Sequence, residues 1–470
     1  MGRFLTGFDT ISYYVPTVFN WIHNGASVFE VSASAPLFYG LLIGLGASGI
    51  SSVLAIKTLS PVLLGSLGLA IYFYASKALI WSSKKSLAVS LLATLYFVSL
   101  RISWDMLRTE LAMILLFVFF LLLHGYSSSS GRTWKSSLLL SFIMVMVALS
   151  EQLVSLIMFV VLLSAVFVMF RRRSLADLRS LVLSAIPSFI VFGFGVYSNY
   201  VFSPGAMSLG FPSASLGGWF SLFGFNSPIE MIANIVAFIL FCYFPLLPFL
   251  LLGFRRFKTL ELQVWVAFCL GAALLSFINP LSLIVAGYRW VLLLVFPLAF
   301  FTVEMFSRLN HRNIRKVFVG ALIFLSCSFM LLPAQLAFPY FTLFSNYVPT
   351  SMLQNSVPLS DCEDVVMALS WYGQNIGSNG TLLVHQAFSG WADLYLNANC
   401  KVVNYGYENP QVAAGKLLAN GLELVYVIWW VPGEGWHGLS SMPSSFYEVF
   451  HSGRIAVYEY NSTAQTFSLG

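Results

Sequence analysis

The fold is decided by stretches such as Leu153-Val-Ser-Leu-Ile-Met-Phe-Val-Val-Leu-Leu-Ser-Ala-Val-Phe-Val-Met-Phe170, which is followed directly by Arg171-Arg-Arg173. This stretch has no charged residue and is almost wholly apolar. A membrane-spanning helix needs roughly 20 such residues, because backbone groups in hydrocarbon must find hydrogen-bond partners within the segment. We therefore expect a spanning helix that ends at the arginines.

The rest of the 470 residues repeats this pattern. Hydrophobic residues make up 58% of the chain and charged residues only 9%, against roughly 25% charged in soluble domains. This composition excludes a soluble enzyme, a disordered protein and, despite the net charge of +6, a nucleic-acid-binding domain. We predict a polytopic α-helical membrane protein with spans near 59–76, 86–102, 108–124, 136–150, 153–170, 181–199, 231–253, 262–279, 290–306 and 317–338.

The distribution of Lys and Arg predicts the orientation. Cytoplasmic loops are enriched in these residues, and basic clusters occupy every second loop of this chain. The alternation requires that the apolar run 36–56 does not span, so we expect it to be interfacial or re-entrant. Residues 1–58, the loops near 103–107, 151–152, 200–230 and 280–289, and everything after about 340 then lie outside. The clusters are Lys77/Lys84/Lys85, Arg132/Lys135, Arg171/Arg172/Arg173/Arg179, Arg255/Arg256/Lys258 and Arg308/Arg312/Arg315/Lys316.

The composition changes after about residue 340, where Gly, Asn, Ser and charged residues become more frequent. Strands alternating with helices predict a small α/β domain there. We divide the chain into a first outer loop with juxtamembrane helices (1–58), a transmembrane domain (59–340) and an extracytoplasmic α/β domain (341–470). The last is expected to have helices at 362–376, 389–397 and 410–420, and strands at 381–385, 401–405, 424–430, 446–450 and 454–460.

Cysteine and histidine give little evidence of a cofactor site. The five cysteines form no C-x-x-C pair, and the three histidines of the outer domain do not have the spacing of a metal site. We expect these histidines to be structural. Cys362 and Cys400 are the cysteines of the outer domain, where an oxidising compartment would permit a disulfide. The sequence leaves their pairing open, because it does not set their separation.

Ionisable residues at membrane depth are functional candidates, because burying charge in lipid is costly. Asp9 precedes an aromatic-rich run and is either a helix N-cap or a functional carboxylate. Asp105 lies between two predicted spans, in Arg101-Ile-Ser-Trp-Asp-Met-Leu-Arg-Thr-Glu110. It either forms an ion pair with Arg101 or Arg108 beside a helix N-terminus, or acts as a general base or metal ligand.

Two further polar sites interrupt the predicted spans on the same side. Glu151-Gln152 separates two apolar runs and is either a polar turn or a place of substrate contact. Arg289 opens a predicted span between Tyr288 and Trp290. It either anchors the helix at the interface or binds a lipid phosphate, which suits the planar guanidinium.

The order of these features resembles the GT-C superfamily of polytopic glycosyltransferases, of the protein mannosyltransferase and aminoarabinose transferase type. These enzymes use polyprenyl- or dolichyl-phosphate-linked sugars. Five segments carry the resemblance: Gly7-Phe-Asp9 with Tyr13-Tyr14 at the start of the first outer loop, Ala35-Pro-Leu-Phe-Tyr39 at the juxtamembrane helix, Arg101 with Asp105 in a short outer loop, Tyr288-Arg289-Trp290 with Pro297 in a late helix, and Ala368-Leu-Ser-Trp371 to Asn379-Gly-Thr-Leu-Leu383 in the outer domain.

The resemblance implies an inverting transfer of a sugar from a polyprenyl- or dolichyl-phosphate-linked donor, at the outer face of the cell membrane. The acceptor would be a lipid, a glycan or a protein. Asp9 and Asp105 would be the catalytic carboxylates, and a divalent metal, if one is used, would bind there. The donor phosphate would contact Arg289, Arg101 and Arg108, and the substrate would contact Glu151, Gln152, Tyr13 and Tyr14.

Two differences from the family narrow these expectations. The family's first helix is missing before Asp9, and we expect it to be encoded upstream. The Trp-Trp-Asp-Tyr-Gly signature of oligosaccharyltransferases is replaced by His385-Gln-Ala-Phe-Ser-Gly-Trp391, which favours a monosaccharide transferase over the N-glycosylation enzyme. The alternative functions are a transporter or flippase of a polyprenyl-linked substrate and a non-catalytic surface-assembly protein.

Overall fold

The structure is a computed structural model in which the chain forms two compact units. The membrane unit comprises Asn24–Val348, and the α/β unit comprises Met1–His23 together with Pro349–Gly470. The predicted domain boundaries at 58 and 340 stay predictions. The described residues are 4–5, 7, 9–128, 134–171, 175–202, 227–256, 259–275, 287–309, 312–332, 334–345, 357–397, 399–405, 410–421, 424–434 and 442–461.

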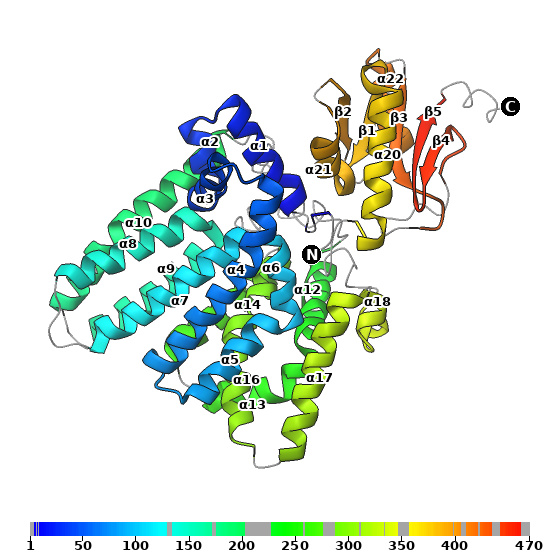
Figure 1. Cartoon of the computed structure of the whole chain (residues 1–470). Coiled ribbons are helices and arrows are strands. Elements are labelled where there is room, and N and C mark those ends of the chain that lie inside the picture. The colour runs from blue at the N-terminus through cyan, green and yellow to red at the C-terminus, as the bar shows by residue number, and fades with distance from the viewer. Residues whose placement is uncertain are drawn as a thin grey trace. The chain divides into compact units, whose positions relative to one another are not determined.

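Helices build the membrane unit, and most of them lie side by side (Figure 1). They are α2 (Val28–Ala33), α3 (Pro36–Ala47), α4 (Ser52–Phe73), α5 (Ser83–Leu95), α6 (Phe97–Asp105), α7 (Leu107–Ser128), α8 (Trp134–Ser150), α9 (Gln152–Arg171), α10 (Leu175–Phe202), α12 (Pro228–Tyr243), α13 (Leu247–Arg256), α14 (Leu260–Leu274), α15 (Gly287–Leu293), α16 (Val295–Ser307), α17 (Arg312–Leu331) and α18 (Ala334–Ala337).

Each of the predicted spans overlaps helical residues, but 86–102, 231–253, 290–306 and 317–338 each fall on two α-helices, and residues 276–279 and 333 lie outside the described residues. Not all of these helices are long enough to cross a bilayer alone. Within the described ranges, seven helices have the length and apolar composition of a membrane span, and α5 and α6 make an eighth if taken together. That pair is bent by 59°. The bend occurs at Tyr96, which leaves the helical conformation with ψ 141°. Helices α8 and α14 have 17 and 15 residues, shorter than the roughly 20 that hydrocarbon requires.

The apolar run 36–56 is not one helix. Helix α3 ends at Ala47, and α4 begins at Ser52 after a turn that includes Gly49 with φ +87°. The 12 residues of α3 span only about 18 Å at 1.5 Å per residue. Helix α3 therefore does not cross the hydrocarbon core alone, in agreement with the prediction, whereas its place at the interface stays a prediction.

Aromatic side chains fill the core of the membrane unit. Phe117 of α7 lies between Trp265 of α14, at 5.9 Å, and Phe300 of α16, at 6.1 Å between ring centroids. A close backbone approach fixes α13 against α16, because a Cβ atom at Gly253 would lie 2.2 Å from the Phe301 carbonyl oxygen. These contacts hold α7, α13, α14 and α16 together in the centre of the membrane unit.

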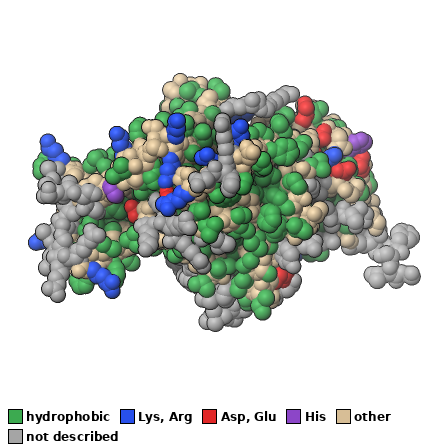
Figure 2. Space-filling model, turned by 90° about the horizontal axis from the view of Figure 1, so that it is seen from below, with side chains coloured by type: hydrophobic (Ala, Val, Ile, Leu, Met, Phe, Trp, Pro, Cys, Tyr) green, Lys and Arg blue, Asp and Glu red, His purple; other side chains and the backbone are tan. Residues whose placement is uncertain are grey.

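The spanning helices give the membrane unit two ends. The Asp105 end is the one at which α6 ends and α7 and α9 begin, and the Lys85 end is the one at which α5 begins and α16 ends. Lys and Arg side chains lie among apolar ones over the helices of this unit when the molecule is viewed from below Figure 1 (Figure 2). Arg132, Arg172, Arg173 and Lys258, which were also predicted to mark topology, lie outside the described residues.

The α/β unit contains a five-stranded sheet of order β2-β1-β3-β5-β4. β1 pairs in parallel with β2 and β3, and β5 pairs antiparallel with β3 and β4. All six residues of β3 are buried, as expected for a central strand covered on both faces. The elements are α1 (Val15–Asn24), α20 (Cys362–Asn375), β1 (Thr381–His385), α21 (Gln386–Tyr395), β2 (Lys401–Tyr405), α22 (Pro410–Ala419), β3 (Val425–Trp430), β4 (Phe446–Ser452) and β5 (Ile455–Tyr460).

The order of predicted elements in this unit is confirmed, and β1 and β2 have the predicted bounds. The helix predicted at 389–397 is displaced, because His385 caps α21 and starts it at Gln386. The disulfide left open by the sequence is not formed, since Cys362 and Cys400 are both free thiols. Cys362 instead donates its thiol hydrogen to the Pro358 carbonyl at 3.5 Å.

Candidate active site

A one-residue break between α6 and α7 places two charged residues at the Asp105 end. Met106 leaves the helical conformation with ψ 52°, and its amide still bonds the Ile102 carbonyl at 2.7 Å. Arg101 and Asp105 lie one turn apart on α6, and their Nη1 and Oδ2 atoms are 2.5 Å apart. Both side chains are buried. The structure thus brings this predicted pair together and supports the ion-pair interpretation of Asp105.

A second ion pair joins α7 to the α8–α9 junction. The Nε atom of Arg108 lies 2.7 Å from Oε2 of Glu151, and the Glu151 side chain is buried. Glu151 stands between the two helices and Gln152 begins α9. A Cβ atom at Gly195 of α10 would be 3.6 Å from the Gln152 side-chain nitrogen, so Gln152 faces α10. The predicted polar turn at Glu151-Gln152 is therefore a point where α7, α8, α9 and α10 meet.

Glu110 is a site residue to which the sequence gave no role. It lies on α7 two residues after Arg108, and it is 1% exposed. Neither carboxyl oxygen has a hydrogen-bond partner among the residues that the structure describes. A buried carboxyl group without a partner is costly and marks a functional candidate. The sequence could have indicated Glu110 by its position near the start of a predicted span.

Arg289 lies on α15, a helix that packs against α6. Its side chain is half-buried, whereas Trp290 beside it is buried. The helix that carries Arg289 is thus a neighbour of the helix that carries Arg101 and Asp105. This places the predicted phosphate-binding arginine at the same end of the membrane unit as both ion pairs.

Asp9, Tyr13 and Tyr14 belong to the α/β unit. They lie in and just before η1, a single π-helical turn at Thr10–Tyr14. Asp9 is 2% exposed and stands at the N-cap position of this turn, where its side chain makes no capping bond. Tyr14 is buried and Tyr13 is exposed. Asp9 is therefore a buried carboxylate at the start of the turn, and its catalytic role stays a prediction.

The turn that carries Asp9 packs closely on α21. A Cβ atom at Gly390 would lie 2.6 Å from the Ile11 carbonyl oxygen, so only glycine permits this approach. The same helix begins at His385, whose Nδ1 accepts a hydrogen bond from the Ala387 amide at 3.2 Å. The segment 385–391, which differs from the oligosaccharyltransferase signature, thus positions the residues around Asp9.

His385 ends β1, where the strand order of the parallel part of the sheet reverses. Its ring lies 5.1 Å from that of Trp429 on β3 and 5.5 Å from that of Tyr405 on β2. Burial raises the pKa of the Tyr405 phenol, which therefore stays protonated. Ligands of open parallel sheets bind outside the carboxyl ends of the strands at such a reversal. The sequence could not indicate this position, because strand order is not visible in it.

A divalent metal does not fit the groups at the Asp105 end. Over the described parts of the chain, no group of three His, Cys, Asp or Glu side chains is arranged to hold a metal ion. The Asp105 carboxylate is also neutralised by Arg101 at 2.5 Å. We therefore derive no chemical step through a metal.

The sequence alone matches no known family model and no curated protein. The structure is similar to that of ArnT from Cupriavidus metallidurans bound to undecaprenyl phosphate, with a TM-score of 0.52 and 12% identity over 98% of this chain and 95% of that chain. The apo state of the same protein gives a TM-score of 0.51 and 14% identity over 97% and 94% of the chains. The oligosaccharyltransferase of Archaeoglobus fulgidus gives a TM-score of 0.46 and 13% identity over 97% and 69%.

The likeness to ArnT covers nearly the whole of both chains, and at this identity it establishes the fold. ArnT, an aminoarabinose transferase, is a GT-C glycosyltransferase. The chain is a multi-pass membrane protein with the fold of ArnT, an α-helical membrane unit and a small C-terminal sheet domain, as the sequence predicted.

Proposed function

We propose that the chain is a membrane glycosyltransferase that moves a sugar from a polyprenyl-phosphate-linked donor to an acceptor hydroxyl at the outer face of the membrane. The observation that carries the proposal is the fold likeness over 98% of the chain to a transferase whose structure contains undecaprenyl phosphate. Buried charge at one end of the membrane unit supports it. Charge at membrane depth is energetically costly, so charged residues found there usually have a function.

The proposed reaction is a single displacement. The acceptor oxygen forms a bond to the anomeric carbon, the bond from that carbon to the donor phosphate breaks, and the configuration inverts. Asp9 takes the acceptor proton as a general base, which is worth about 10²- to 10⁴-fold in rate. The polyprenyl phosphate leaves with the bonding electrons, and an arginine stabilises its charge.

The geometry distinguishes the three arginines proposed for the phosphate. Arg101 and Arg108 each hold a buried carboxylate, Asp105 and Glu151. Arg289 is half-buried on α15 at the same end, and we propose that it contacts the donor phosphate, with Arg101 and Arg108 close behind it. Asp105 then acts as the counter-charge that orients Arg101. The predicted contacts of substrate with Glu151, Gln152, Tyr13 and Tyr14 remain part of this proposal.

The test measures release of polyprenyl phosphate by the chain in nanodiscs, with polyprenyl-phosphate-linked sugars as donors. Asp9→Asn should lower turnover at least 100-fold, because the amide cannot accept the proton. The unfolding temperature should stay unchanged, and Glu363→Gln, which alters an exposed acid of the same unit, should keep full turnover. Unchanged turnover in Asp9→Asn contradicts the assignment, and movement of the donor across the bilayer without release of polyprenyl phosphate favours a transporter.

A second variant tests whether the position of η1 matters without altering Asp9. Gly390→Ala introduces a methyl group 2.6 Å from the Ile11 carbonyl oxygen, which forces η1 away from α21. Turnover should fall at least tenfold, while Gly415→Ala on α22, where nothing lies within 4 Å, should have no effect on turnover. Equal turnover in both variants would show that η1 has no role in the reaction.

A further inference from the structure

A groove runs along the membrane unit between α5–α6 and α16–α17. Its volume is about 680 Å³, and its lining is almost wholly apolar. Leu91 and Leu95 form part of one wall, and Leu322 and Ile323 part of the other. Thr302 contributes a hydroxyl, but this donates to the Leu298 carbonyl at 2.8 Å. Ser326 adds a second hydroxyl, and the Tyr96 phenol in the lining donates to the Cys242 carbonyl at 2.7 Å.

Aromatic contacts near the two ends of α17 explain why the groove stays open. Towards the Lys85 end, the Phe318 ring lies 4.3 Å from Phe249 and 5.3 Å from Phe306. Towards the other end, Phe329 stacks on Trp104 at 5.0 Å. Between these clusters the helix stands away from α5, and Ile323 is 59% exposed. The helix is thus held at both ends over an open apolar channel.

The length of the groove suits a single lipid chain. Its wall on α17 extends from Phe318 to Leu331, which is about 20 Å of helix. The hydrocarbon core of a bilayer is about 30 Å thick, so one leaflet contributes about half of that. Apolar surface at this depth faces lipid tails rather than water. A chain that enters from the Lys85 end fills the groove past the middle of the membrane.

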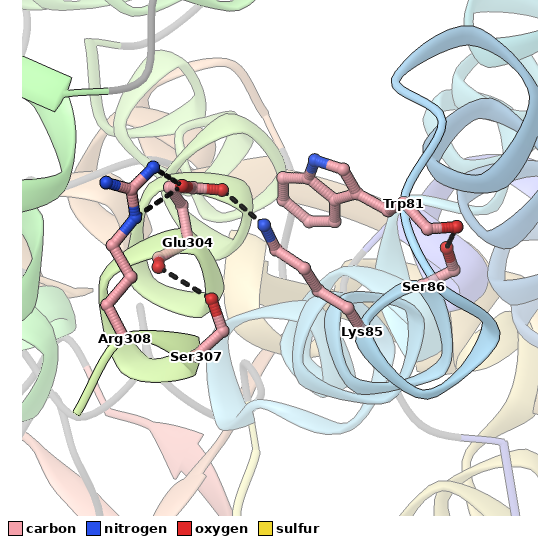
Figure 3. A network of polar contacts seen from close by, with 6 residues as sticks. All are labelled: Trp81, Lys85, Ser86, Glu304, Ser307 and Arg308. Atoms are coloured by element: carbon pink, nitrogen blue, oxygen red, sulfur yellow. Dashed lines mark hydrogen bonds and ion pairs between the residues drawn. The ribbon is translucent and has the colours of Figure 1, made fainter. Parts of the chain in front are cut away.

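The Lys85 end of the groove has an excess of positive charge. Glu304 of α16 accepts hydrogen bonds from Lys85 of α5 and from Nε and Nη2 of Arg308, at 2.9 and 2.5 Å for the latter two (Figure 3). The Lys85 ammonium also lies 3.8 Å above the Trp81 ring. Groove residues Ala88, Val303 and Phe306 lie within one turn of this network.

Part of this charge is open to a ligand. The Arg308 side chain is 53% exposed, and its Nη1 points away from Glu304 (Figure 3). Lys84 on α5 and Lys316 on α17 are exposed on either side of the groove. The single carboxylate of Glu304 does not neutralise the positive charges of Lys84, Lys85, Arg308 and Lys316. A phosphate group at this end would therefore meet arginine and lysine donors.

We propose that the groove binds an acyl chain of an anionic phospholipid, whose phosphate contacts Arg308 and Lys84. The inference is independent of sugar transfer, since it concerns the end of the membrane unit opposite Asp105. It requires two matching features: an apolar channel about 20 Å long that accommodates one acyl chain, and cationic side chains at its Lys85 end. A zwitterionic lipid of the same chains fits the channel but has no net charge for the mouth.

The test compares phosphatidylglycerol with phosphatidylcholine of identical chains, added to the detergent-solubilised full chain. Native mass spectrometry should show retained phosphatidylglycerol, and the unfolding temperature should rise more with this lipid than with phosphatidylcholine. Ile323→Trp, which fills the groove, and Lys84→Gln combined with Arg308→Gln should each at least halve that difference. Ile190→Trp on α10 is the matched control, because Ile190 is 65% exposed and lies outside the groove.

Two results would overturn the proposal. Equal stabilisation by both lipids, or an undiminished difference in Ile323→Trp, would show that the groove does not select an anionic phospholipid. Co-purification of polyprenyl phosphate that is lost in Ile323→Trp would assign the groove to the donor tail instead. If Ile323→Trp does not fold, the double variant Lys84→Gln/Arg308→Gln tests the proposal, and an undiminished difference between the two lipids in that variant overturns it.

Discussion

The two ends of the membrane unit use charge differently. At the Asp105 end, Arg101 pairs with Asp105 and Arg108 with Glu151, and the Arg101 and Asp105 side chains are only 8% and 6% exposed. At the Lys85 end, Glu304 holds two cations at once, and one of them, Arg308, is more than half exposed. The first arrangement places charge where water is excluded, and the second displays it at the surface.

This difference has consequences for energy and for function. Breaking a buried ion pair leaves an uncompensated charge in a medium that solvates it poorly. Exposed cations regain solvent when their partner is removed, so their pairing contributes little. The Asp105 end is thus suited to holding reacting groups in fixed positions. The Lys85 end is suited to contacts with mobile charged groups of lipid.

The largest effect is expected for Asp105→Ala. This change leaves the buried Arg101 guanidinium without its counter-charge, which costs about 3 kcal/mol or more in the free energy of unfolding. Sugar transfer should be lost as well. Thermal or denaturant unfolding in detergent measures the first quantity, and release of polyprenyl phosphate measures the second.

A double variant separates stability from catalysis. Arg101→Met combined with Asp105→Leu removes both charges and keeps the volume filled, so most of the stability should return. Transfer should remain absent if the pair takes part in the reaction. If sugar transfer recovers together with stability, the Arg101–Asp105 pair stabilises the fold and takes no part in the reaction. The Asp105 and Lys85 ends would then differ in their contribution to folding only.

Sequence patterns predicted the parts of the fold that depend on local composition. Spans follow from runs of apolar residues, and β1 and β2 follow from short apolar runs between Gly- and Asn-containing turns. The bend at Tyr96 was not predicted, because it changes backbone angles without interrupting the apolar pattern. The grouping of Met1–His23 with Pro349–Gly470 was not predicted either, since it depends on contacts between the ends of the chain.

In the candidate site, too, the sequence predicted contacts between residues close in the chain and missed those between distant segments. The Arg101–Asp105 pair is local, because the residues are one helical turn apart. The Arg108–Glu151 pair and the contact of Gly390 with η1 join distant segments, so no spacing reveals them. Lys85 and Arg308 were predicted only as topology markers. Glu304 lies 219 residues from Lys85, so no spacing reveals that contact, whereas Arg308 is one helical turn from Glu304 and this pair could have been predicted.

An intermediate effect is expected for Glu151→Gln. The variant keeps the shape of the side chain but removes the charge opposite Arg108, whose side chain is 28% exposed. Partial access to solvent limits the loss to about 1–2 kcal/mol in the free energy of unfolding. Unfolding at matched ionic strength measures it. A loss as large as that of Asp105→Ala would show that the solvent exposure of an ion pair at this end does not determine how much its loss destabilises the fold.

The smallest effect is expected for Glu304→Gln at the Lys85 end. Arg308 is already exposed, and Lys85 keeps its contact with the Trp81 ring, so the free energy of unfolding should fall by about 1 kcal/mol or less. Raising the salt concentration should reduce this difference further, because screening weakens exposed pairs. The same salt change should leave the effect of Asp105→Ala nearly constant. If both variants respond equally to salt, the two ends present their charges to the same environment, and the division between a buried reactive end and a lipid-facing end fails.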